Sequence, residues 1–404
     1  MLLDEKQIYC SYYTKSDPIV QYMVGSLELR PHMRALEPSS GDGVFIDALL
    51  DKEQITIDAY ELNPNAVSQL NNKYGNNEQV EVFESDTLLD SVLDFKASMG
   101  GFYDVVIANP PYGAWQELEK RRLLKKIYPG FYVKETYSLF LYRCITLLKE
   151  GGQLTFIVPN TYLNLHRHRA LRNFLFTNTK IKEIALFPSS FFPGVNFGYA
   201  DLSIISLIRH SNVNECLTNE FAVIDGFKNV SELEKVHYDY DLLNKCRLSR
   251  FTQRQVFDNP DHALYIVDNP PISEVLSGRF SRLENVADCV TGFYSGDDKA
   301  FVRELSLGNS KQLKYDTIHH DEIRYNYLAI DDLLNGVSEE PYFLPMMKGG
   351  GIRFYKPSSH YINWNREAVN HYKKDKKARF QNSNYYFRQG IGIPMVSSSK
   401  ISAA

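Results

Sequence analysis

The first half of the chain predicts an α/β fold, in which helices cover both faces of a mostly parallel sheet. Two observations support this prediction: short apolar runs alternate with helical stretches, and several runs stop at turn-forming residues. The clearest run is 103–108, which ends at Asn109-Pro110. Because ligands of such sheets bind beyond the carboxyl ends of the strands, the residues that follow each run are the candidate site.

The expected strands are, in order, 34–38, 56–61, 80–83, 103–108, 153–158, 181–187 and 202–208. A helix over 44–51 separates the first two strands, and a helix over 137–149, ended by Gly151-Gly152, precedes the fifth. Strands linked by helices in this rhythm are typical of a parallel sheet. We therefore expect a Rossmann-like, seven-stranded domain over residues 1–210.

The second half of the chain lacks this alternation of strands and helices. From about Asn212 it consists of short segments with turn signals such as Asp258-Asn259-Pro260. The length of 404 residues also exceeds what one core of ordinary size needs. We expect a second, mixed α+β domain over residues 211–404.

The composition is that of a folded chain, since 44% hydrophobic and 23% charged residues exclude a disordered or collagen-like class. Forty-five Lys and Arg against 49 Asp and Glu give a net charge of −4. The total charge therefore does not indicate a nucleic-acid partner, and such a role must rest on local sites.

Cysteine spacing and the N-terminal sequence bear on the compartment. The five cysteines form no Cys-x-x-Cys pair, which indicates neither a metal site nor a disulfide framework and favours a reducing, cytoplasmic setting. Acidic residues among the first ten argue against a signal peptide. Arg143 interrupts the apolar run 139–148, so no membrane anchor is expected.

A glycine-containing loop follows the first strand and leads into a helix. In Pro38-Ser39-Ser40-Gly41-Asp42-Gly43, the two glycines allow a tight turn and a close approach to a ligand. The third glycine of a dinucleotide fingerprint is missing, and Asp42 would repel a pyrophosphate. The loop therefore indicates a ligand with a cationic centre and an amino-acid end rather than NAD.

Acidic residues follow the next two strands. Glu61 ends the second strand, where a carboxylate in this architecture accepts hydrogen bonds from ribose hydroxyls, and Asp86 follows the third. Each feature alone is also typical of an ordinary turn or a solvated strand end. Their order and spacing together predict a nucleoside-containing ligand that carries a positive group.

The motif Asn109-Pro110-Pro111-Tyr112 follows the fourth strand. Methylation of an exocyclic amino group requires the nitrogen lone pair to be made available without a strong base. The Asn109 side-chain oxygen and the Pro110 carbonyl would each accept one amino hydrogen, the prolines would stiffen the backbone, and Tyr112 would stack on the base. The alternative is a plain strand-ending turn, which all four residue types suit.

These motifs resemble the adenine-N6 class of S-adenosylmethionine-dependent DNA methyltransferases, which have a class I methyltransferase fold. Tyr12-Tyr13-Thr14, before Ser16-Asp17-Pro18, is similar to the N-terminal cofactor motif of that class. The resemblance implies that Glu37, Glu61 and Asp86 contact the methionine amino group, the ribose and the adenine of the cofactor. The implied cofactor-binding set is Tyr13, Thr14, Glu37, Pro38, Ser39, Gly41, Asp42, Gly43, Phe45, Glu61, Asp86 and Asn109.

The same resemblance assigns the substrate side of the site. It implies that Asn109, Pro110, Pro111 and Tyr112 are catalytic, and that no metal is required. Phe191-Phe192-Pro193-Gly194 resembles the segment whose ring covers the other face of the flipped base, which implies a stacking role for Phe192 beside Tyr112. An ordinary core position for Phe192 is the alternative.

The second half resembles the target recognition region of Eco57I-like and Alw26I/Eco31I-like methyltransferases. This resemblance implies double-stranded DNA as partner and a restriction endonuclease or phage-defence system as context. It also implies that the recognition domain is incomplete, because such proteins continue beyond the position of Ala404. Candidate phosphate contacts are Lys299, Lys348, Arg353, the run 373–379 and Arg388.

Two other functions stay open. Enzymes that methylate a protein glutamine or an rRNA base face the same chemical problem, so the Asn-Pro-Pro-Tyr motif does not separate them. A DNA-binding subunit without catalytic activity is the second alternative. The layout favours DNA, since almost half of the chain follows the catalytic half.

Overall fold

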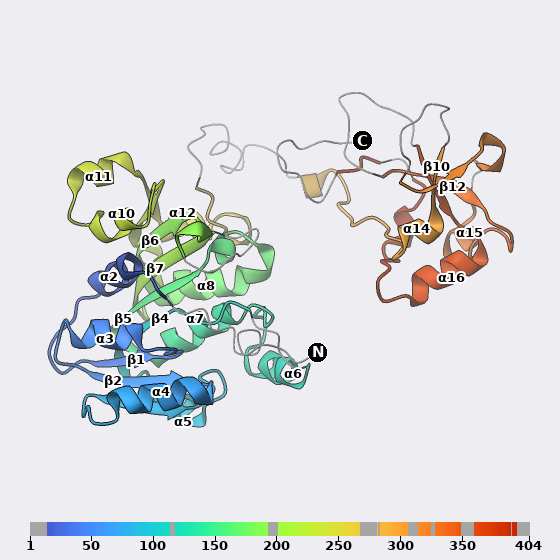
Figure 1. The fold of residues 1–404 in the computed structure, drawn as a ribbon. Helices are drawn as coiled ribbons and strands as arrows, with labels where there is room; N and C mark the ends of the chain where they lie inside the picture. The colour runs from blue at the N-terminus through green and yellow to red at the C-terminus, as the bar shows by residue number, and fades with distance from the viewer. Residues whose placement is uncertain are drawn as a thin grey trace. The chain divides into compact units, whose positions relative to one another are not determined.

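The computed structural model describes residues 14–113, 118–192, 201–266, 281, 283–305, 314–324, 328–348, 359–388 and 390–393 (Figure 1). The chain divides into two compact units, Met1–Ser277 and Gly278–Ala404. Each unit has its own sheet and is described separately below.

The first unit is built on a nine-stranded sheet with the order β3-β2-β1-β4-β5-β7-β6-β8-β9. Its strands are β1 Arg34–Glu37, β2 Thr56–Glu61, β3 Val80–Glu84, β4 Tyr103–Ala108, β5 Leu148–Pro159, β6 Thr179–Phe187, β7 Leu202–Arg209, β8 Glu220–Asp225 and β9 Arg247–Thr252. Strands β1 to β5 pair in parallel, whereas β7 and β9 run antiparallel to their neighbours. The predicted Rossmann-like α/β fold is confirmed.

Two strands beyond the seven expected ones extend the sheet. Strand β8 pairs in parallel with β6 through Glu183↔Ala222, and β9 pairs with β8. Helix α9 (Val213–Thr218), capped by the Asn212 side chain, supplies the crossover from β7. The helix–strand alternation therefore continues past residue 210, and the compact unit ends at Ser277 rather than at the expected boundary.

The glycine pair after α7 has a different role from the expected one. Helix α7 (Thr136–Leu147) ends before Gly151-Gly152, and both glycines lie within β5. Leu148 pairs with Tyr103, but the next partner of β4 is Gln153, so the intervening residues bulge out of the ladder. Gly151, with φ +78°, adopts the left-handed conformation that this bulge requires.

Helices cover both faces of this sheet. They are α2 Asp17–Gly25, α3 Val44–Leu50, α4 Pro64–Tyr74, α5 Ser91–Ser98, α6 Leu118–Ile127, α7, α8 Arg169–Asn178, α9, α10 Ser231–Lys235, α11 Tyr240–Lys245 and α12 Gln253–Phe257. Helix α2 packs against α3 and α10, and α7 packs against α5 and α8. Among the described residues, no helix combines the length and the apolar character needed to cross a membrane.

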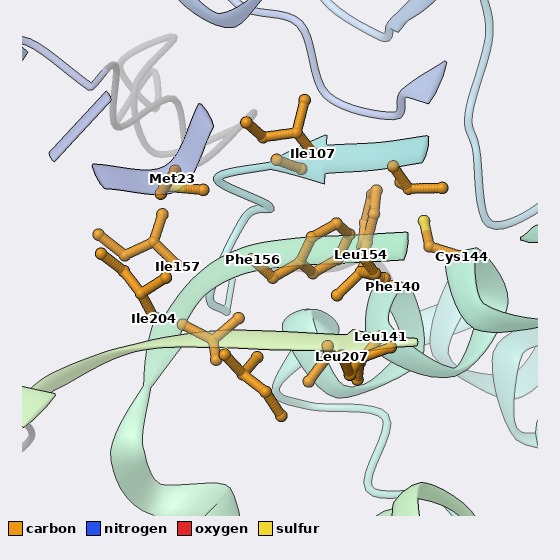
Figure 2. Close-up of a cluster of buried hydrophobic side chains, with 14 of the residues drawn as sticks. Met23, Ile107, Phe140, Leu141, Cys144, Leu154, Phe156, Ile157, Ile204 and Leu207 are labelled. Carbon is orange, nitrogen blue, oxygen red and sulfur yellow. The ribbon is translucent and has the colours of Figure 1, made fainter. Parts of the chain in front are cut away.

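The core lies between the central strands and these helices. Figure 2 shows Phe140, Leu141 and Cys144 of α7 gathered against Leu154 and Phe156 of β5. Successive side chains of β5 alternate between the two faces of the sheet. Ile157, which follows Phe156, is therefore directed to the opposite face, toward Met23 of α2. Burial on both faces explains why the central strands are continuous apolar runs.

The second unit holds a four-stranded sheet with the order β11-β10-β13-β12. Its elements are α14 Asp298–Phe301, β10 Val302–Leu305, β11 Asp316–Ile318, α15 Ile330–Asn335, β12 Phe343–Met346, β13 His360–Asn363 and α16 Arg366–Lys374. Trp364, buried to 1% exposure, is central to its core and packs against Phe293 and Tyr372. This unit has the expected mixed α+β character.

A buried polar cluster ties α5 to the sheet. Lys96 Nζ of α5 lies 2.8 Å from Asp58 Oδ2 of β2, and the Tyr103 hydroxyl of β4 donates to the same oxygen at 2.7 Å. Burial, followed by the charge of Asp58, raises the pKa of Tyr103 well above its ordinary value. The side chains of Lys96 and Asp58 are only 12% and 10% exposed, so each charge depends on the other.

We expect Lys96→Met to lower the free energy of unfolding of the first unit by about 3–5 kcal/mol, because the Asp58 carboxylate would stay buried without its counter-ion. Lys149→Met is the matched control, since Lys149 also lies 2.8 Å from an aspartate, Asp104, but is 49% exposed. Its expected cost is below about 1 kcal/mol. Hydrogen exchange of the β2 and β4 amides measures the change in unfolding free energy for both variants. Equal losses in the two variants would contradict the prediction.

Candidate functional site

The candidate site lies where β1, β2, β3 and β4 end. Because these strands are parallel, their carboxyl ends meet at one edge of the sheet. Glu37 and Glu61 are the last residues of β1 and β2, Asp86 comes two residues after β3, and Asn109 directly follows β4. The fold therefore brings the predicted motifs to the same edge.

The loop after β1 is shaped by packing as well as by its glycines. Gly41 (φ +52°) and Gly43 (φ +79°) both adopt left-handed backbone conformations. A Cβ atom on Gly43 would lie 2.6 Å from the Tyr74 hydroxyl of α4, so a larger side chain would displace that ring. The Tyr74 hydroxyl is also 3.0 Å from the Gly43 carbonyl and 2.7 Å from Asp47 Oδ1. Gly43 is thus required by the fold itself.

Glu61 holds two loops together. Its Oε2 accepts a hydrogen bond from the Gly41 amide at 2.8 Å, and its Oε1 accepts from the amides of Leu62 and Asn63 at 2.8 Å each. These bonds fasten the glycine loop to the turn that begins α4. A carboxylate oxygen accepts two hydrogen bonds, so Oε2 keeps acceptor capacity for a ligand hydroxyl.

Glu37 carries a buried carboxyl group that forms no ion pair with the described residues. Its side chain is 1% exposed, and no described group hydrogen-bonds its Oε2 atom. Burial raises the pKa of Glu37 well above its ordinary value, and the nearby charges of Asp42, Glu61 and Asp47 raise it further. An isolated buried carboxylate is costly, so this position suits a cationic group of a ligand.

Asp86 is held by a residue that the sequence analysis did not single out. Its Oδ1 accepts from the Leu88 amide at 3.0 Å, and its Oδ2 lies 2.5 Å from Lys120 Nζ on α6. Helix α6 is anchored nearby, because the Tyr128 hydroxyl donates to the Leu88 carbonyl at 2.8 Å and Leu124 is fully buried. The run of basic residues over 120–126 was the available signal for this helix.

Asn109 connects the N-terminal motif to the glycine loop. Its Nδ2 donates to Thr14 Oγ1 at 3.1 Å, and its backbone carbonyl accepts from Ser39 Oγ at 3.3 Å. The next turn is fixed as well, since the Pro111 carbonyl accepts from Thr136 Oγ1 at 2.6 Å. Because Thr14 holds the amide nitrogen, the Asn109 side-chain oxygen is the end that serves as a hydrogen-bond acceptor.

The two rings expected to stack on a base are both buried. Tyr112 is 6% exposed and Phe192 is 1% exposed, and both belong to the core of the first unit. Burial raises the pKa of Tyr112 well above its ordinary value. Phe192 thus lies in the hydrophobic core, which was the alternative to its expected stacking role. Stacking of a base on either ring stays a prediction.

Other expected site residues are placed as follows. Phe45 is 2% exposed in the core, Asp42 is exposed, and the Pro38 carbonyl accepts from Thr87 Oγ1 at 2.6 Å. Tyr13 lies outside the described residues, as do Pro193 and Gly194. Within the described residues, no three His, Cys, Asp or Glu side chains gather as a metal ion would require.

The second unit contains several of the expected phosphate contacts. Lys348 is paired with Asp298, and its Nζ lies 4.9 Å from the centre of the Tyr315 ring. Lys373 Nζ donates to Asn335 at 3.2 Å. Arg353 lies outside the described residues. A role in DNA binding for these side chains stays a prediction.

Known proteins share sequence with part of this chain. The chain is 27% identical to the type II methyltransferase M.HindII of Haemophilus influenzae over 332 residues, 76% of this chain and 59% of that protein. It is 31% identical to the type II restriction enzyme and methyltransferase RM.Eco57I of Escherichia coli, over 63% of this chain and 24% of that protein. The chain thus spans less than two thirds of the length of either relative.

A solved structure and a family model complete the comparison. A modification subunit of a putative type I restriction enzyme from Vibrio vulnificus aligns with 61% of this chain and 56% of its own, at 17% identity and a TM-score of 0.48. The family model of the Eco57I restriction-modification methylase matches residues 11–192, a range that contains the glycine loop and the Asn-Pro-Pro-Tyr motif. Residues 11–192 are therefore similar to the Eco57I restriction-modification methylase family.

Proposed function

We propose that this chain is a site-specific DNA methyltransferase, which transfers a methyl group from S-adenosylmethionine to N6 of a flipped adenine in double-stranded DNA. The observation that carries the proposal is the junction of Thr14, Ser39 and Asn109, which joins the glycine loop to the Asn-Pro-Pro-Tyr motif. The relatives named as type II methyltransferases support the reaction class and a restriction-modification or phage-defence context, with a restriction endonuclease as a candidate partner.

The residues at the sheet edge fit the proposed cofactor. Glu37 offers a buried carboxyl group whose Oε2 has no hydrogen-bond partner among the described residues, which suits the amino group at the methionine end. Glu61 keeps acceptor capacity for a ribose hydroxyl, and Asp86 offers a carboxylate to the adenine amino group. When bound, S-adenosylmethionine supplies a methyl group that its sulfonium centre already activates.

Asn109 and Pro110 act on the amino group that is to be methylated. The adenine N6 lone pair is delocalised into the ring. The Asn109 side-chain oxygen and the Pro110 carbonyl oxygen each accept a hydrogen bond from one of the two N6 hydrogens. These two bonds favour a tetrahedral nitrogen with an available lone pair. Thr14 and Thr136 hold this turn from both sides, so the two acceptors keep their direction. The residues thus supply alignment rather than a strong base.

Incubation of the chain with methyl-labelled S-adenosylmethionine and DNA tests the proposal. Label recovered as N6-methyladenine in DNA is the expected result. Label in RNA or in protein would replace the proposal with one of the two alternative substrates. DNA binding without any transfer would favour a binding subunit that has no catalytic activity.

Asn109→Ala is expected to lower the rate of methyl transfer by about 10²–10³, because one of the two acceptors that act in the transition state is lost. Cofactor binding should change little, since Glu37 and the glycine loop remain. Single-turnover kinetics and calorimetric titration with S-adenosylmethionine measure the two effects. Loss of both together would show that Asn109 mainly holds the fold or the cofactor.

Glu37→Gln is expected to weaken S-adenosylmethionine binding by about 1.5–3 kcal/mol, roughly tenfold to a hundredfold in Kd, because a charge-assisted hydrogen bond becomes a neutral one. The same change should stabilise the cofactor-free chain. Glu37 has a raised pKa in the fold, so its contribution to stability is present below the ordinary carboxyl pKa and is lost as the pH rises through the raised value.

The stability advantage of Glu37→Gln over the parent chain should therefore grow as the pH rises above about 4.3. Urea unfolding at a series of pH values, without cofactor, measures it. Glu84→Gln is a suitable control, since Glu84 ends β3 near the same edge but is exposed. A constant difference between Glu37→Gln and the parent chain across the pH range would contradict the assignment.

Lys120→Met is expected to tighten S-adenosylmethionine binding several-fold. The Lys120 ammonium takes one of the two acceptor positions of Asp86 Oδ2 and competes there with the amino group of the cofactor adenine, so its removal ends this competition. Adenosine binding should tighten by a similar factor, since the competition concerns the adenine alone. Weaker binding of both ligands would show that Lys120 supports the site instead.

A further inference from the structure

Helix α6 (Leu118–Ile127) carries a concentration of positive charge that neither the proposed chemistry nor the core explains. Its ten residues include five Lys or Arg and one Glu, a net charge of +4. The whole chain has a net charge of −4. The helix begins six residues after Tyr112, so this charge stands beside the candidate catalytic motif in the sequence.

One stripe of α6 faces the first unit. Lys120 and Leu124 of α6 are spaced one turn apart, and Tyr128, directly after the helix, continues this spacing and donates its amide to the Leu124 carbonyl at 2.8 Å. Lys120 pairs with Asp86, Leu124 is fully buried, and the Tyr128 hydroxyl donates to the Leu88 carbonyl. The helix is therefore fixed to the loop after β3, at the edge of the sheet where the candidate site lies.

The opposite side of α6 is exposed and basic. Arg122, Lys125 and Lys126 are exposed, and none of them forms an ion pair with a described residue. Arg121 is half-buried, and its Nε atom has no hydrogen-bond partner among the described residues. In contrast, many other cations of this unit, such as Lys73 and Lys180, are paired with acids.

The acidic residues of the candidate site explain why positive charge is needed on this side of α6. Glu37, Asp42, Glu61 and Asp86 all lie at the carboxyl edge of the sheet, and they suit a cationic cofactor but repel a polyanion. A substrate with a phosphate backbone needs compensating positive charge at the same edge. A helix that is rigidly held there, with several unpaired cations, meets this need.

We propose that the exposed side of α6 binds the phosphate backbone of the DNA next to the target base. The inference rests on the proposed function and extends it by naming a contact surface in the first unit, in addition to the expected contacts in the second. Phosphate contacts position the duplex without reading its sequence. Random-sequence DNA is therefore a valid probe, although the recognition sequence is unknown.

The test compares two double variants of the full chain. Arg122→Gln/Lys126→Gln removes two cations that lie one turn apart on α6. Lys52→Gln/Arg254→Gln is the matched control, since it also removes one Lys and one Arg, both exposed. Lys52 precedes β2, and Arg254 follows the antiparallel strand β9, so both lie near the amino edge of the parallel strands, away from the site.

The measured quantity is the slope of log binding constant against log salt concentration for a 30-bp random duplex. Each lost phosphate contact reduces the magnitude of the slope by about 0.9, so the α6 variant should lose about 1.8 and the control nothing. Calorimetric titration with S-adenosylmethionine should give unchanged affinity for both variants, which shows that the fold at the site is intact.

Three outcomes overturn the inference. Unchanged slope in the α6 variant, while the parent chain methylates DNA, refutes it and leaves the proposed function standing. Equal losses in both variants would show a general charge effect. A parent chain that neither binds nor methylates DNA overturns the inference and the proposed function together.

Discussion

The parallel direction of β1 to β4 is the constraint on which the rest of the site depends. Residues that are far apart in the sequence meet only because each strand ends at the same edge of the sheet. The bond from Asn109 to Thr14 spans 95 residues, and the bond from Ser39 to the Asn109 carbonyl spans 70. Short loops on a rigid sheet hold these groups more firmly than long loops would.

Several residues at this edge serve the fold and the proposed chemistry together. Glu61 fastens two loops through three backbone amides and still keeps acceptor capacity. Gly43 is required by the Tyr74 ring as much as by a ligand. A substitution at either position is therefore a poor probe of cofactor binding, because loop structure and ligand contact would be lost together. Glu37, whose Oε2 has no hydrogen-bond partner among the described residues, separates the two effects better.

Local sequence signals predicted the strands and loops of the site, because each depends on a few neighbouring residues. Strands β8 and β9 were missed, since β9, at the edge of the sheet, has no fully buried residue and the places of both strands are set by long-range pairing. The Lys120–Asp86 pair was missed for a similar reason, as it joins α6 to a distant loop. The burial of Phe192 depends on the whole core, which no local pattern reports.

The total charge of the chain is close to neutral, but two regions of the first unit carry opposite local charge. Carboxylates gather at the strand ends, where Glu37 stays buried at a cost in stability, and cations gather on α6 close by. Destabilising charges that persist in a fold are typical of binding sites, because the ligand that neutralises them regains the lost stability. A cationic cofactor and a polyanionic substrate make opposite demands. Under the proposed function, segregation of the two charges onto a strand edge and a helix would satisfy both within one unit.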